Sequence, residues 1–186
     1  GLGDVYKRQA TEILDCRTMP YTKKTQDMGE IFRVDAKAEG DKVAIGGWRT
    51  TDGAVASKAL WFSVTLTRAS APWAFARGEP FRTIASLELL ASLVGLMVLV
   101  PNRGPDRDTA ALLSLSCGTG NQGNTYLLDR LMTTKYPLGA VLMELAHQMR
   151  LRRVVLRANW LPRLENEEAD ALTNLDFRHF SASNRI

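Results

Sequence analysis

Two carboxylates occur in otherwise apolar stretches of this chain. Asp35 interrupts an alternating strand-like pattern, and Glu88 is the only charged residue in residues 83–100. A carboxylate in apolar surroundings is costly unless it is paired, binds a metal ion or reaches a cleft. Glu88 is therefore more informative than a surface acid. Asp35 by itself has a simpler interpretation, an acid on an edge strand that faces water.

The residues around Asp35 predict a pair of strands. Side chains alternate between the two faces of a strand, so Phe32 and Val34 share one face while Asp35 lies on the other. Residues 39–41 have turn chemistry, and residues 43–48 read as a second strand. Asp35 is thus expected on a rigid element.

A third strand is predicted over residues 54–67, and it would complete an antiparallel meander. One side of it would carry Leu60, Phe62, Val64 and Leu66. The apolar residues 83–100, closed by Pro101, predict a buried core helix. They are at the short limit for a membrane span, and Glu88 weakens that interpretation further.

The second half of the chain predicts two more strands and three helices. The strands are expected at residues 111–117 and 153–160, with helices at residues 124–135 and from Pro137 onward between them. Asn166 is expected to cap a last helix, with Asp170 one turn inside it. This order predicts an α/β fold with a mixed five-stranded sheet flanked by helices.

Composition places the chain among ordinary globular domains. Of its 186 residues 45% are hydrophobic and 24% are charged, which suits one domain that folds unaided. The net charge of +4 permits nucleic-acid binding but does not require it. Cys16 and Cys117 lie far apart, which predicts a reduced intracellular protein of the nucleus or cytoplasm without disulfides or structural zinc.

The sequence divides into four segments. Residues 1–9, GLGDVYKRQ, resemble a translated sequencing-library adapter, and a natural basic arm is the alternative. If they are foreign, the chain is the tail of a longer protein. Residues 10–29 read as a linker, residues 30–175 as the domain, and residues 176–186 as a C-terminal tail.

Three acidic motifs follow one another along the chain: V-D-A at residues 34–36, S-L-E-L-L at residues 86–90 and N-E-E-A-D-A-L at residues 166–172. In this order they resemble the ribonuclease H domain of retroelement reverse transcriptases. The resemblance runs from about Glu30 to the end of the chain. It implies a ribonuclease H-like fold, an RNA–DNA hybrid as substrate, an upstream polymerase domain in the same polyprotein and no membrane partner.

The resemblance also implies hydrolysis with two Mg²⁺ ions roughly 4 Å apart, with Mn²⁺ as an alternative metal. Asp35 would bridge the ions, Glu88 would hold the one nearer the leaving group, and Asp170 would hold the one that activates water. A fourth acid of the family, typically in a T-D-N context, is replaced here by Gly120. The amide oxygen of Asn121 would be only a weak substitute ligand. Because the charge of the fourth acid is missing, we expect much reduced activity.

Two other functions compete with this one. A non-catalytic domain that binds hybrids or acts as a spacer would use Arg153, Arg157, Arg163 and Trp160, and Arg150, Arg152 and Trp48 are further candidates. The plain alternative is that these arginines face solvent. Gly118, Gly120 and Gly123 also match a dinucleotide fingerprint, but its acid, Glu144, falls inside a predicted helix.

Overall fold

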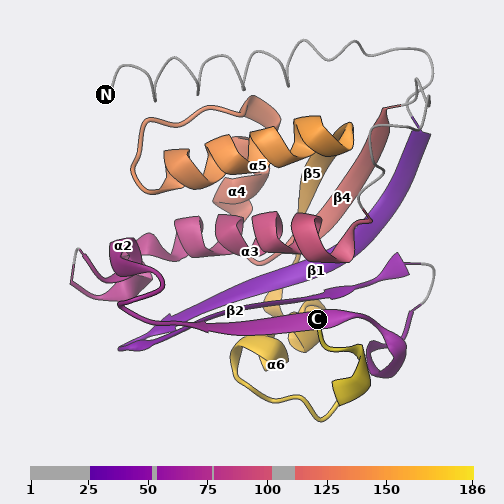
Figure 1. The fold of residues 1–186 in the computed structure, drawn as a ribbon, viewed down its shortest axis with the longest axis horizontal. Coiled ribbons are helices and arrows are strands. Elements are labelled where there is room, and N and C mark those ends of the chain that lie inside the picture. The colour runs from indigo at the N-terminus through magenta and orange to yellow at the C-terminus, as the bar shows by residue number, and fades with distance from the viewer. Residues whose placement is uncertain (1–25, 52–53, 77, 102–111) are drawn as a thin grey trace.

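The computed structural model describes residues 26–51, 54–76, 78–101 and 112–186 (Figure 1). A five-stranded sheet with the order β3-β2-β1-β4-β5 runs through it. Its strands are β1 (Gln26–Glu39), β2 (Lys42–Arg49), β3 (Trp61–Leu66), β4 (Leu113–Thr119) and β5 (Val154–Trp160). β1, β2 and β3 form an antiparallel meander, and β4 runs parallel to both β1 and β5. The predicted mixed sheet is confirmed, and Asp35 lies on the central strand rather than on an edge strand.

The first and third strands differ from their predicted limits. β1 begins at Gln26, four residues before the expected start of the strand at Glu30. Residues 54–60 are not strand, because Ala56–Lys58 forms a short 3-10 helix before β3. Leu60 and Val64, which alternation places on the same side as the buried Phe62 and Leu66, are 39% and 41% exposed.

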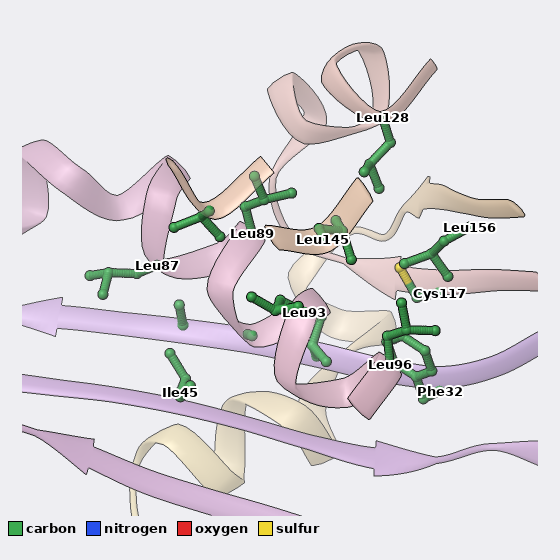
Figure 2. Close-up of a cluster of buried hydrophobic side chains, with 14 of the residues drawn as sticks. Phe32, Ile45, Leu87, Leu89, Leu93, Leu96, Cys117, Leu128, Leu145 and Leu156 are labelled. Atoms are coloured by element: carbon green, nitrogen blue, oxygen red, sulfur yellow. The ribbon is translucent and has the colours of Figure 1, made fainter. Parts of the chain in front are cut away.

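The central helix α3 (Ile84–Leu99) explains where the main core lies. It packs on β1 and β2 and beside α5 (Leu138–Arg152). Figure 2 shows its leucines, among them Leu89, Leu93 and Leu96, between these elements. The segment Pro80–Leu99 is long and apolar enough to cross a membrane by length and composition alone. In this fold it is a buried core helix, as predicted.

Three shorter helices complete this side of the molecule. They are α2 (Pro72–Phe75), the 3-10 helix Pro80–Thr83 that leads into α3, and α4 (Gln122–Arg130) after β4. The sequence predicted that α4 would reach residue 135. It ends earlier, because Leu131 adopts a left-handed conformation with a φ of 49° and closes the helix.

The other face of the sheet is covered by α6 (Glu167–Thr173) and the residues that follow it (Figure 1). Phe177 and Phe180 pack against Trp48 and Trp61 in a second, smaller core. Ile186 donates a backbone hydrogen bond to the carbonyl of Trp61, at 3.0 Å. The C-terminal residues are thus packed along the edge of β3 at Trp61. Trp61, Phe62 and Ser63 are all buried although they alternate between the two faces, while Val64 is exposed, so burial along β3 does not follow simple alternation.

Candidate active site

A cavity of about 640 Å³ opens at the end of the sheet where β1, β4 and β5 meet α3 and α6. The parallel register of β1 and β4 pairs Val34 with Thr119, which brings Asp35 beside Gly120. Glu88 and Asp170 reach the same cavity from α3 and α6. The structure therefore brings all four predicted site positions together from segments far apart in the sequence.

Asp35 is half-buried on the cavity wall, and its Oδ2 accepts a hydrogen bond from the Thr173 hydroxyl at 3.1 Å. Burial raises the pKa of Asp35 to about 6, and the charge of Asp170 adds to this. The Thr173 hydrogen bond and the positive charge of Arg163 act in the opposite direction. Asp35 is thus an acid whose charge is only partly compensated by the protein.

Glu88 is more deeply placed, with 5% of its surface exposed. Its Oε2 accepts a hydrogen bond from the Thr119 hydroxyl at 3.1 Å. Burial, together with the nearby charge of Asp35, raises the pKa of Glu88 to about 8, against the Thr119 hydrogen bond. The expectation that this helical carboxylate reaches a cleft agrees with its place on the cavity wall.

Gly120 faces both of these acids. A Cβ atom built on it would lie 3.5 Å from Asp35 Oδ1 and 3.6 Å from Glu88 Oε1, which is ordinary contact distance. A side chain at position 120 would therefore extend into the space between two carboxylates. Nothing in the local packing requires glycine there.

Gly118 differs from Gly120, although the two belong to the same glycine-rich motif. A Cβ atom at Gly118 would overlap the Leu161 side chain and would lie 3.0 Å from Arg33 Cγ. Glu144, the acid of the dinucleotide fingerprint, lies inside α5. The first glycine of the motif thus serves close packing, and the second opens onto an acidic cavity that would repel a pyrophosphate.

Asp170 is held differently from the other two acids. Its Oδ1 forms an ion pair with Arg163 at 3.0 Å, and its Oδ2 accepts a hydrogen bond from Asn174 Nδ2 at 2.9 Å. Among the residues that the structure describes, no three His, Cys, Asp or Glu side chains gather closely enough to hold a metal ion. Asp35 and Glu88 thus both face Gly120, while Asp170 is held by Asn174 at the end of α6 and by Arg163 before that helix.

Two polar side chains near the site make contacts that the sequence did not predict. Asn166 makes no capping hydrogen bond; its Nδ2 instead donates to the carbonyl of Val34 at 3.0 Å and fastens the start of α6 to β1. Asn121 caps α4 by accepting from the Asn124 amide at 3.3 Å. It is not among the residues that line the cavity, and its role as a substitute ligand stays a prediction.

The sequence reasoning missed the hydroxyl groups that hold the acids. Thr119 directly precedes Gly120, and Thr173 follows Asp170 by nearly one helical turn. A signal existed in both cases, because a hydroxyl beside a candidate acid is a ready hydrogen-bond donor to a carboxylate. Their pairing with Glu88 and Asp35, however, crosses between distant elements.

The predicted nucleic-acid contacts fall into two groups. Trp160, 49% exposed, and Arg163 both line the cavity. Arg157 is exposed midway along β5, and Arg153 immediately precedes the strand, roughly 23 Å from Trp160 at about 3.3 Å per residue. Arg153 therefore lies at the far end of β5 from the cavity.

Two further candidates prove to be buried. Trp48 is 6% exposed and packs edge-on against Phe180, with ring centroids 6.2 Å apart. Arg152 is 8% exposed, and its guanidinium donates to the Gln148 side chain. Neither residue is available for nucleic acid, because both serve the packing of the domain.

Comparison with solved structures shows a ribonuclease H-like fold. Ribonuclease H1 from the halophilic archaeon Halobacterium salinarum is 17% identical and has a TM-score of 0.51, covering 81% of this chain and 97% of its own. The N-terminal RNase H domain of a Mycobacterium tuberculosis protein, solved as a maltose-binding protein fusion, is 16% identical with a TM-score of 0.50, covering 80% and 93%. No protein-family model matches the sequence, and no curated protein sequence matches it either.

Proposed function

We propose that this domain binds RNA–DNA hybrids and hydrolyses the RNA strand, at a rate much reduced by glycine at position 120. The observation that carries the proposal is the position of Gly120, whose added Cβ would lie within 3.6 Å of both Asp35 and Glu88. The fold and the order of the acidic motifs support it. The same motifs lead us to place the domain after the polymerase of a retroelement reverse transcriptase.

The donor atoms facing the cavity suit Mg²⁺, and Mn²⁺ is an alternative. Both are hard cations that prefer oxygen ligands, and Mg²⁺ is held by one or two carboxylates together with water and substrate phosphates. Asp35 and Glu88 fit that description, and their raised pKa values show that the protein compensates little of the charge that either carboxylate would carry, so a bound cation would stabilise the ionised forms. When bound, a metal pair would activate the attacking water and stabilise the leaving oxygen.

Other side chains of the protein would orient the carboxylates and contact the nucleic acid. Thr119 and Thr173 orient Glu88 and Asp35 through their hydroxyl hydrogen bonds. Trp160 offers an exposed aromatic surface on which a base or sugar could pack, and Arg163 offers a cation at the cavity rim. In this proposal Asp170 becomes a metal ligand only when Arg163 releases it.

Cleavage of a labelled RNA–DNA hybrid in Mg²⁺ and in Mn²⁺ tests the proposal. Gly120→Asp should cut at least roughly tenfold faster than the natural chain, because it adds an oxygen ligand between two existing ones. Gly120→Ala is the matched control, and Gly120→Asp combined with Asp35→Asn should lose the gain. Equal cleavage by the natural chain and Gly120→Asp would show that position 120 is not the missing ligand.

A non-catalytic hybrid-binding or spacer domain is the second candidate function. The ion pair between Arg163 and Asp170 favours it, because a cation of the protein already occupies one of the acids. If folded Gly120→Asp does not cut while the natural chain binds hybrid with a steep salt dependence, the binding function is supported. Absence of both cleavage and binding would leave a spacer.

A further inference from the structure

A second hollow adjoins the acidic cavity at the β1–β2 hairpin. It measures about 290 Å³ and lies between the hairpin, β3 and the C-terminal end of α6. We call it the hairpin groove. It shares Lys37 and Asn174 with the acidic cavity, so these two residues form a common wall between the hollows.

The common wall is built from defined contacts. Lys37 Nζ donates to Asn174 Oδ1 at 2.7 Å and pairs with Glu39 Oε2 at 2.9 Å. The first contact ties β1 to the end of α6. The groove is therefore adjacent to the acidic cavity, and a long ligand that lies across the cavity would reach the groove by passing over the contact between Lys37 and Asn174.

The charges of the groove are unlike those of the cavity. Asp41 pairs with Arg68 at 3.0 Å, and Glu39 pairs with Lys37, so the acids of the hairpin already have cationic partners. Lys42 is exposed in the groove and forms no ion pair with any residue that the structure describes. Thr65, also exposed, adds a hydroxyl from β3. The groove thus offers a positive charge and a hydrogen-bond donor.

The spacing suits a nucleic-acid strand. A β-strand rises about 3.4 Å per residue, so Lys37 lies roughly 7 Å along β1 from Asp35. Lys42 lies opposite Glu39 in the register of β1 and β2, so it is roughly 14 Å from Asp35 along the same axis. A backbone that passes Asp35 and follows β1 would bring later phosphates to the groove.

We infer that the hairpin groove is a phosphate subsite for the nucleic-acid strand that crosses the acidic cavity, with Lys42 as its main contact. This inference rests on the proposed function and adds to it the path that the nucleic-acid strand takes across the domain. The strand runs from Trp160, past Asp35 and Glu88, and along β1 to Lys42. Because the contact is made to phosphate, it adds affinity without sequence preference.

Fluorescence anisotropy of a labelled RNA–DNA hybrid, titrated at several salt concentrations, tests the subsite without requiring cleavage. Lys42→Ala should weaken binding several-fold at low salt and make the slope of log K against log salt shallower by about 0.7 to 1. Lys42→Glu should weaken binding further. Lys58→Ala is the matched control, since Lys58 is exposed on the 3-10 helix at the opposite end of β2 and β3.

The outcomes separate the two proposals. If the natural chain binds with a salt-dependent affinity, and Lys42→Ala and Lys58→Ala both match it, the groove is not a subsite while the proposed function stands. If the natural chain shows no hybrid binding, both proposals are wrong. Circular dichroism melts of all variants establish that they are folded.

Discussion

At the residue scale, Asp35 and Glu88 share a buried environment that favours their protonated forms. The pKa of Glu88, about 8, is well above its ordinary value of 4.5, and the pKa of Asp35 is raised in the same direction. The native state therefore holds protons that the unfolded chain has released. The contribution of Glu88 to the free energy of unfolding should therefore fall as pH rises between about 4.5 and 8.

We predict that Glu88→Gln is more stable than the natural chain at pH 8, by on the order of a few kcal/mol. The neutral amide removes the cost of burying a charge and can still accept from Thr119. The difference should shrink as pH falls toward 4.5. Urea unfolding at three pH values measures it, with the exposed Glu79→Gln as control. A pH-independent difference would contradict the raised pKa.

The two glycines at the end of β4 predict opposite responses to alanine. Gly118→Ala should cost about 1 to 3 kcal/mol, because the added methyl overlaps Leu161. Gly120→Ala should stay within about 0.5 kcal/mol, since its methyl meets only ordinary contacts. Thermal melts of both variants compare them directly. Equal losses would mean that Gly120 is also held by packing.

At the scale of elements, the position of α6 decides the geometry of the site. Asn166 ties its first turn to the carbonyl of Val34, and Gly46 lets its Leu172 pack close to the sheet. A Cβ atom at Gly46 would lie 2.7 Å from Leu172 Cβ. Asp170 lines the cavity and Thr173 holds Asp35, both from this short helix, so displacement of α6 would move both.

We predict that Asn166→Ala lowers the free energy of unfolding by about 1 to 3 kcal/mol, because it leaves a buried carbonyl without its donor. Asn166→Asp should cost more, since a carboxylate cannot donate and adds charge near Asp35. Urea unfolding provides the measurement. Asn159→Ala, at an exposed position on β5, serves as control. If the natural chain and these three variants share one urea midpoint, Asn166 does not anchor α6.

At the scale of the whole molecule, the C-terminal residues cover the open edge of the sheet at Trp61, where β3 begins. Trp61 Nε1 donates to the carbonyl of Ser181 at 2.7 Å, and Arg185 stacks over the Trp61 ring, 5.2 Å from its centroid. Unpaired strand edges are templates for association with other chains. The last residues therefore protect β3 as well as cover its outer face.

Phe180→Ala should lower the free energy of unfolding by about 3 kcal/mol, because it empties the small core around Trp48 and Trp61. Deletion of residues 176–186 should in addition promote self-association through the exposed β3 edge. Tryptophan fluorescence in urea and light scattering measure these two effects. His179→Ala, at the neighbouring exposed position, is the control. If Phe180→Ala unfolds at the same urea midpoint as this control, the small core contributes little to stability.

Local patterns in the sequence determined most of the elements. Alternation located the strand around Asp35, and the run of apolar residues before Pro101 located α3 with Glu88 inside it. The order of these elements was enough to predict the mixed sheet, because strand and helix periodicity depend only on neighbouring residues. The candidate acids were found in the same way, as charges in apolar stretches or within motifs.

Only the tertiary structure decided what these residues meet. Burial of the first residues of β3, of Trp48 and of Arg152 depends on segments distant in sequence, and so does the hydroxyl group that each acid accepts from. The contrast between Gly118 and Gly120 is of the same kind, since one meets Leu161 and the other meets two carboxylates. Local periodicity carries no information on such contacts, because they arise when separate elements pack against each other.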